Sequence, residues 1–164
     1  YQLLLLFQQV QIILDYILSI EMINRLHEII LTFFYIGYLK PMPGTYASLV
    51  TAALCYYIPN NYIFYILFLI LIIASYSCYL FDKKSDQKDP SYIVIDEVLG
   101  MVLALILLPK NLYLYFIAFL LFRVFDITKP SLIYHSQNLN YGIGILMDDL
   151  ISGLLVLIIM VGFI

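Results

Sequence analysis

The chain has 164 residues, of which 64% are hydrophobic and only 12% are charged, and its mean hydropathy is +0.99. This balance excludes an ordinary water-soluble domain and predicts that lipid surrounds much of the surface. The net charge of −3 provides no basic field, so nucleic-acid binding is excluded as well. The two cysteines, Cys55 and Cys78, match no zinc or disulfide pattern, and we expect both to be buried.

The first segment, residues 1–21, is apolar and begins with Tyr1 rather than with a methionine. It has neither a basic region nor a small-residue cleavage site, so it does not have the features of a signal peptide. We predict that Met22 is the natural start and that residues 1–21 are an extension. The alternative is an additional membrane-associated helix. Residues 22–36 follow with apolar side chains at helical spacing, which predicts an amphipathic helix.

Five further helices are predicted along the rest of the chain, and proline-containing breaks separate several of them. They comprise residues 46–58, 62–81, 91–108, 112–125 and 143–164. Residues 62–81 contain no charge, and at about 1.5 Å per residue they reach roughly 30 Å, the thickness of one hydrocarbon core. Short turns join neighbouring helices into antiparallel hairpins. We therefore predict an all-α integral-membrane bundle that forms one domain, residues 22–164.

The turns at 59–61 and 109–111 predict the topology of this bundle. If both turns lie on one side of the membrane, the loops 37–45, 82–90 and 126–142 lie on the other side. The basic residues on the loop side are Lys40, Lys83, Lys84, Lys88, Arg123 and Lys129, against Lys110 alone on the turn side. The positive-inside rule therefore predicts a multi-pass protein whose loop side faces the cytoplasm.

Two pairs of adjacent acids stand in apolar surroundings: Asp96 with Glu97, and Asp148 with Asp149. Two carboxylates about 4 Å apart repel by roughly 4 kcal/mol at an effective dielectric near 20, so they must be protonated, paired with bases or joined by a cation. The functional interpretation is a Mg²⁺ site with all four as ligands. The structural alternative is placement at helix N-termini, where the helix dipole favours acids. It suits Asp148 and Asp149 better than the other two, which we expect further inside their helix.

Arg123 and Lys129 supply donors suited to a phosphate group. The alternative is a basic flank that ends a membrane span, with one internal ion pair to Asp126. Gly44 and Thr45 stand just before a predicted helix, where Thr45 is expected to be the N-cap and the amides of the next two residues are available for an anion. A simple helix cap is the alternative there. Walker loops, nucleophile elbows and phosphoaspartyl motifs are absent from the sequence.

Four stretches together resemble one family: "GYLKPMPGTYAS" (37–48), "DPSYIVIDEVLGM" (89–101), "RVFDITKP" (123–130) and "YGIGILMDDLISG" (141–153). Their order and spacing are similar to those of the phosphatidylglycerophosphatase A family of bacterial inner membranes. The resemblance covers about residues 22–164. It implies a Mg²⁺-dependent membrane phosphatase that converts phosphatidylglycerophosphate to phosphatidylglycerol. The first stretch departs from the usual family pattern at Leu39, Met42 and Ala47.

Taken with this resemblance, the residues predict one active site at the cytoplasmic end of the bundle. Asp126 is expected to orient or deprotonate a water molecule, and an aspartyl-phosphate intermediate remains the alternative. The predicted site consists of catalytic Asp126, Asp149 and Asp96, of phosphate-binding Gly44, Thr45, Arg123 and Lys129, and of the metal ligands Asp96, Glu97, Asp148 and Asp149. The expected partners are a phospholipid substrate and the membrane. Two rival hypotheses are a small ion or proton transporter with intramembrane carboxylates and a scaffold subunit whose acids pair with a partner's bases.

Overall fold

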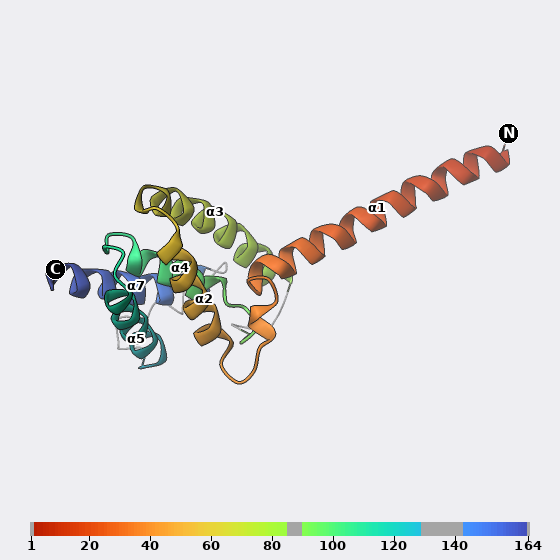
Figure 1. Ribbon diagram of the computed structural model, residues 1–164. Helices are drawn as coiled ribbons and strands as arrows, with labels where there is room; N and C mark the ends of the chain where they lie inside the picture. Colours follow the sequence, from red (N-terminus) through yellow and green to blue (C-terminus); the bar gives the residue numbers. More distant parts are fainter. Residues whose placement is uncertain (1, 85–89, 129–142, 164) are drawn as a thin grey trace.

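A computed structural model describes residues 2–84, 90–128 and 143–163 of the chain. All regular structure in these ranges is helical, which confirms the predicted all-α class. The elements are α1 (Gln2–Leu31), the 3-10 helix η1 (Ile36–Tyr38), α2 (Pro43–Tyr57), α3 (Asn60–Lys84), α4 (Ile95–Leu105), α5 (Leu112–Thr128) and α7 (Ile143–Gly162). Figure 1 shows α2, α3, α4, α5 and α7 gathered into a bundle, from which most of α1 projects.

Helix α4 lies at the centre of the bundle. Nearly all of its residues are buried, and α2, α3, α5 and α7 all pack against it (Figure 1). Helix α5 packs against α4, as the predicted hairpin of these two helices requires. The hairpin predicted for residues 46–81 differs, because α2 and α3 pack mainly against α4 rather than against each other. A helix with apolar residues on every side, such as α4, needs partners all round it.

A pair of glycines allows α4 and α7 to approach very closely. A Cβ atom at Gly153 would lie 2.2 Å from the carbonyl oxygen of Gly100, and one at Gly100 would lie 2.5 Å from the carbonyl oxygen of Asp149. Asp96 precedes Gly100 by four residues, and Asp149 precedes Gly153 by four residues. The two acids therefore stand one helical turn before the point of contact, on the sides where the helices face each other.

The first helix crosses the predicted boundary at Met22 and ends earlier than expected. It runs unbroken from Gln2 to Leu31 instead of covering residues 22–36. The Thr32 hydroxyl donates to the Glu28 carbonyl at 2.8 Å and accepts the Tyr35 amide at 3.0 Å. Residues 33–35 then adopt positive φ values of 46°, 55° and 67°, which ends the helix. The predicted division of the chain at Met22 stays a prediction.

Two other helix starts differ from the predicted ones. Helix α2 begins at Pro43 rather than at residue 46, because proline suits the first helical position. Met42 is therefore the N-cap, and the prediction that Thr45 caps this helix is wrong. Helix α4 begins at Ile95 rather than at residue 91, because the Val94 amide donates to the Leu31 carbonyl at 2.9 Å and holds the preceding segment against the end of α1.

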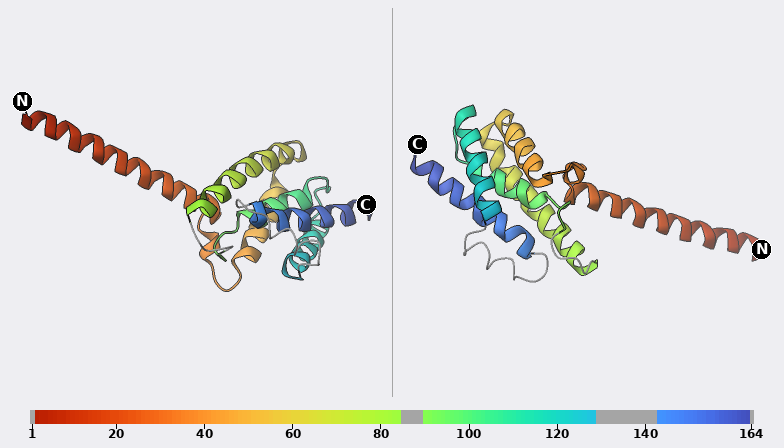
Figure 2. Two further views of the ribbon diagram at one scale, coloured as in Figure 1. Left: turned by 180° about the vertical axis from the view of Figure 1, so that it is seen from behind. Right: turned by 90° about the horizontal axis from the view of Figure 1, so that it is seen from below.

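The bundle has two chemically different ends, with the helix axes running between them (Figure 2). At one end the two short turns meet, since the Asn60 side chain donates to the Leu108 carbonyl at 3.4 Å and Lys110 donates to the Cys55 carbonyl. We call this the turn end. The other end, which we call the acid end, holds Asp96 and Asp149. The two turns therefore lie close together at one end of the bundle, and the side of the membrane that they occupy stays a prediction.

One helical stretch of the described chain, Asn60–Phe81, is long and apolar enough to cross a membrane.

Candidate active site

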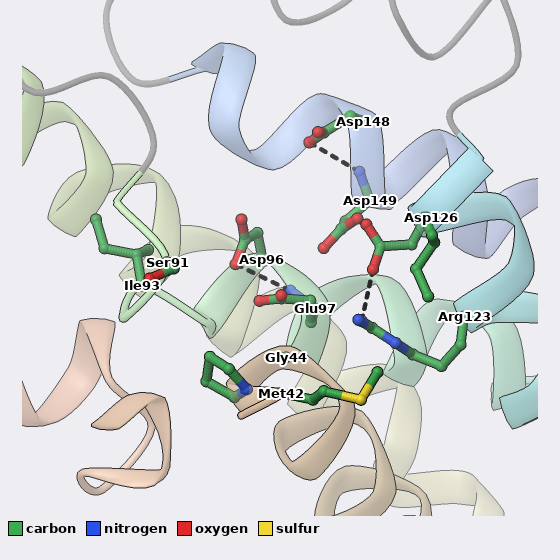
Figure 3. Close-up of a pocket in the computed structure, with 12 residues that line it drawn as sticks. Met42, Gly44, Ser91, Ile93, Asp96, Glu97, Arg123, Asp126, Asp148 and Asp149 are labelled. Carbon is green, nitrogen blue, oxygen red and sulfur yellow. Dashed lines mark hydrogen bonds and ion pairs between the residues drawn. The ribbon is translucent and has the colours of Figure 1, made fainter. Parts of the chain in front are cut away.

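A pocket of about 450 Å³ opens at the acid end, where four helices and the segment before α4 converge (Figure 3). Because several helices converge there, residues that are far apart in the sequence line the same pocket. Helix α2 contributes its N-terminus, α4 its first turn, α5 its last turns and α7 its second turn. The lining residues are Met42, Pro43, Gly44, Ser91, Ile93, Asp96, Glu97, Arg123, Asp126, Ile127, Asp148 and Asp149.

Three carboxylates form the centre of this pocket. One oxygen from each of Asp96, Glu97 and Asp149 lies within 4.8 Å of the other two. Asp96 and Asp149 are only 7% and 3% exposed. Burial raises the pKa of the Asp96 carboxyl well above its usual range, and the adjacent Glu97 and Asp149 add to this shift. Burial likewise raises the pKa of Asp149, and its neighbours Asp126 and Glu97 add to that shift.

This geometry fits a hard divalent cation. Buried carboxylates that repel one another are stable as anions only when a cation or a base compensates them. Three oxygens within one small volume are the ligand type that Mg²⁺ prefers. Asp96 and Glu97 do lie in the first turn of α4, so they are less deep than we expected and the helix dipole does favour them. The dipole does not explain why Asp149, from the second turn of another helix, joins them.

Asp148 stands apart from this group of three. Its Oδ1 atom accepts the Asp149 amide at 3.1 Å. Figure 3 shows its side chain above that of Asp149 on α7, and the residue lines the pocket. Its role as a metal ligand stays a prediction. Asp96 bonds in the same way to the amide of the residue that follows it, Glu97, at 3.1 Å.

Arg123 brings a positive charge to the edge of the acidic group. Its Nη1 atom lies 2.5 Å from Oδ2 of Asp126 and 3.5 Å from the hydroxyl of Ser48. Within the described chain, three buried side-chain atoms lack a hydrogen-bond partner: Nε of Arg123 and Oε2 of Glu97, two residues that line the pocket, and Oγ1 of Thr45, which follows Gly44 in the chain. Buried polar groups are almost always bonded, so this cluster of exceptions indicates a place for a polar ligand.

Gly44 allows the N-terminus of α2 to approach the acids. A Cβ atom there would lie 1.9 Å from Oε1 of Glu97 and 3.2 Å from Nη1 of Arg123. The first helical amide bond runs from Tyr46 to the Met42 carbonyl. The amides without an intrahelical partner are consequently those of Gly44 and Thr45, not those of residues 46 and 47 as predicted. They are suited to bind an anion.

Residues 29–164 match the protein family Phosphatidylglycerophosphatase A. The chain belongs to this family.

Similar proteins are found in several bacteria. A protein from Escherichia coli named phosphatidylglycerophosphatase A is 32% identical over 70% of this chain and 69% of its own length. One of the same name from Haemophilus influenzae is 32% identical over 86% of this chain and 90% of its own length. A protein from Bacteroides thetaiotaomicron, named as a candidate phosphatidylinositol-3-phosphatase, is 32% identical over 71% of this chain and 80% of its own length. No solved structure matches the chain.

Membership of the phosphatidylglycerophosphatase A family identifies the chain as a phosphatase and confirms the resemblance inferred from the four sequence stretches. The pocket has groups that suit phosphate-ester chemistry: three carboxylates that could hold a cation, an arginine, and helix amides without an intrahelical partner. Of the predicted residues, Gly44, Asp96, Glu97, Arg123, Asp126, Asp148 and Asp149 line it. Lys129 lies outside the described residues, so its phosphate-binding role stays a prediction.

Sequence reasoning assigned no role to Ser48, although its hydroxyl donates to the Gly44 carbonyl at 2.7 Å and contacts Arg123. The signal was its spacing, four residues after Gly44 on the same face of α2. Ser91 and Ile93 were also missed. They lie in the irregular segment before α4, where no periodic pattern predicts which side chain faces the pocket.

Proposed function

We propose that the protein hydrolyses phosphatidylglycerophosphate to phosphatidylglycerol and inorganic phosphate, with Mg²⁺ as its cofactor. The observation that carries the proposal is the convergence of Asp96, Glu97 and Asp149 beside Arg123 and Gly44, within a chain of this family. Water supplies the oxygen that forms the new bond to phosphorus, and the lipid alcohol leaves as the P–O ester bond breaks.

The three carboxylates Asp96, Glu97 and Asp149 would hold the metal, and Asp148 is proposed as a further ligand. When bound, Mg²⁺ supplies positive charge that stabilises the charge developing on the phosphoryl oxygens. The unpaired Oε2 of Glu97 and the short separation of the three carboxylates support this assignment. The all-oxygen ligand set suits a hard divalent ion, and Mg²⁺ is the ion that we propose.

The phosphate would be held by Arg123, by the amides of Gly44 and Thr45 and by Lys129. Arg123 forms a bidentate contact with phosphate more readily than lysine does, because its planar guanidinium carries parallel donors. Its present partner is Asp126, at 2.5 Å. A phosphate that takes over this contact frees the Asp126 carboxylate to orient or deprotonate the attacking water. An aspartyl-phosphate intermediate is the alternative to direct attack by water.

We further propose that the protein lies in the bacterial inner membrane as a multi-pass protein, with the acid end at the level of the cytoplasmic headgroups. Only 22% of the most apolar window of Asn60–Phe81 is buried, whereas a core helix of a soluble protein is mostly buried. Large apolar side chains are exposed on the outer faces of α5 and α7 too, among them Phe116 at 55% and Ile158 at 61%. Such a surface is stable in hydrocarbon and prone to aggregate in water.

The experiment is a phosphate-release assay on the purified protein in lipid micelles, with and without Mg²⁺. We expect Mg²⁺-dependent turnover, and we expect Asp96→Asn and Asp149→Asn each to lower kcat by at least about a hundredfold, as loss of transition-state charge stabilisation does. Leu54→Met, on the exposed side of α2 outside the pocket, is the control. Normal turnover by both aspartate variants would end this assignment.

Headgroup competition identifies the lipid. Phosphatidylglycerophosphate should be preferred over phosphatidic acid and over phosphatidylinositol 3-phosphate. The third lipid belongs in the comparison because the Bacteroides relative is named for it. A clear preference for either competitor would change the lipid that we assign as substrate, but the protein would still be a phosphatase.

The transporter hypothesis finds no support in the comparisons, all of which name phosphatases. A transporter also needs polar groups along a path between both membrane faces. The clustered carboxylates of the described chain gather at one end instead.

A further inference from the structure

A second cavity lies between α2 and α5, outside the pocket described above. Its volume is about 270 Å³. We call it the α2–α5 groove. Its lining is almost entirely apolar and aromatic, and consists of Leu49, Ala52, Ala53, Tyr56, Tyr57, Leu112, Tyr115, Phe116 and Phe119.

The groove continues the same helix faces that carry the phosphate-binding residues. On α2, Ala52 follows Ser48 by four residues, and Ser48 follows Gly44 by four. On α5, Phe119 precedes Arg123 by four residues. Residues four apart stack on one side of a helix. The contact between Arg123 and Ser48, at 3.5 Å, therefore lies between the residues that line the groove and those that line the acid pocket.

The groove has a buried floor, and aromatic side chains line it at the turn end. Its floor is formed by the buried Ala52 and Phe119, which are 7% and 9% exposed. Ala53 opens the groove, because its small side chain leaves space between the two helices. Tyr56 and Tyr115 meet edge to face at the turn end, with ring centroids 5.6 Å apart. The groove thus lies on the turn-end side of the contact between Arg123 and Ser48, which is the direction in which a lipid chain extends from a headgroup phosphate into the bilayer.

We propose that the α2–α5 groove binds one acyl chain of the lipid substrate while the phosphate occupies the acid pocket. This inference rests on the proposed function. The acyl chain is in an apolar environment both in the groove and in the surrounding lipid, so binding it in the groove adds little hydrophobic free energy. The groove instead positions the substrate. A bound acyl chain fixes the distance and the direction from which the phosphate reaches Arg123 and the acids. The groove therefore determines selectivity for long-chain lipids.

The test fills the groove and compares two substrates. Ala53→Phe places a large side chain in the groove, and Leu54→Phe places the same side chain at the next position, which is exposed and outside the lining. For each variant, kcat/KM is measured with long-chain and with dihexanoyl phosphatidylglycerophosphate in the same detergent micelles. We expect Ala53→Phe to lower kcat/KM for the long-chain lipid about tenfold, through misplacement of the phosphate, and to leave the short-chain value within about twofold of the wild type. Leu54→Phe should match the wild type on both lipids.

If Ala53→Phe loses kcat/KM equally on both lipids, or on neither, the groove proposal is overturned. The proposed function still stands in that case, provided that the wild-type protein releases phosphate. Absence of wild-type phosphate release from both lipids overturns the proposed function, and the groove proposal with it.

A second measurement needs no variant: a phosphatidylglycerophosphate with a photoreactive group in one acyl chain is bound to the wild-type protein and activated by light. Cross-links to α2 and α5 are expected, with Ala53 and Phe116 among the labelled residues. Labelling confined to α3 or α7, or absent because a second copy covers the groove, overturns the proposal.

Discussion

The two ends of the bundle differ in the hydrogen bonding of their buried polar groups. At the turn end, Lys110 donates to the Cys55 carbonyl and, at 2.9 Å, to the Tyr115 hydroxyl. At the acid end, polar atoms of Glu97 and Arg123 are buried without a hydrogen-bond partner. A buried polar group costs free energy unless it is bonded. The paired Lys110 at the turn end therefore indicates a structural role, whereas the atoms without a partner at the acid end indicate a place for a ligand.

The largest expected effect comes from closing the acid end with one methyl group. In Gly44→Ala, the new Cβ would lie 1.9 Å from Oε1 of Glu97, so the carboxylate must move. We expect kcat/KM to fall about a hundredfold, because small misplacements in an active site carry large rate penalties. Phosphate release measures the loss. Gly162→Ala is the matched control, since a Cβ atom there meets nothing within 4 Å.

A change one turn below the acids should affect stability as well as activity. In Gly153→Ala, the added Cβ would lie 2.2 Å from the Gly100 carbonyl oxygen, which is backbone and cannot rotate away. Overpacking of this kind costs about 1–3 kcal/mol. Thermal unfolding in detergent should show a lower Tm than for Gly162→Ala. Equal Tm values for the two variants would show that the close contact of α4 and α7 is not required.

The acid end should also make stability depend on pH when divalent cations are removed. The pKa of Asp96 and of Asp149 is raised in the folded state by burial, so the folded protein binds more protons than the unfolded chain above about pH 4. Stability should therefore fall as the pH rises from 5 to 7, with Tm decreasing by a few degrees. Added Mg²⁺ should reduce this slope by replacing the protons. A slope that is the same in Asp96→Asn as in the wild type contradicts the assignment to this group.

The smallest effect is expected at the turn end. Lys110→Met removes the donor to Cys55 and Tyr115, which should lower the free energy of unfolding by about 1 kcal/mol. Activity per folded molecule should remain that of the wild type, because the residue lies at the opposite end from the acids. Denaturant titration and phosphate release on the same sample separate the two quantities. A large loss of kcat in Lys110→Met would show that the turn end does not have a purely structural role.

Local patterns predicted the helices well and their ends poorly. The apolar stretches 62–81 and 112–125 lie within α3 and α5, since helical periodicity and the absence of charge are properties of neighbouring residues. The start of α4 was misplaced because the Val94 amide bonds to Leu31, which is distant in the chain. The end of α1 was misplaced because it depends on hydrogen bonds of the Thr32 side chain, which a hydropathy pattern does not predict.

The sequence by itself determined the class of the protein: an apolar all-helical chain, two acidic pairs, and motifs that identify a phosphatase family. Only the tertiary structure decided which acids share a site. Asp149 joins Asp96 and Glu97 because Gly153 contacts Gly100 and aligns the preceding turns of α4 and α7. Residues next to one another in the chain set local periodicity, but the distance between two helices depends on the side chains that separate them, which come from positions far apart in the chain.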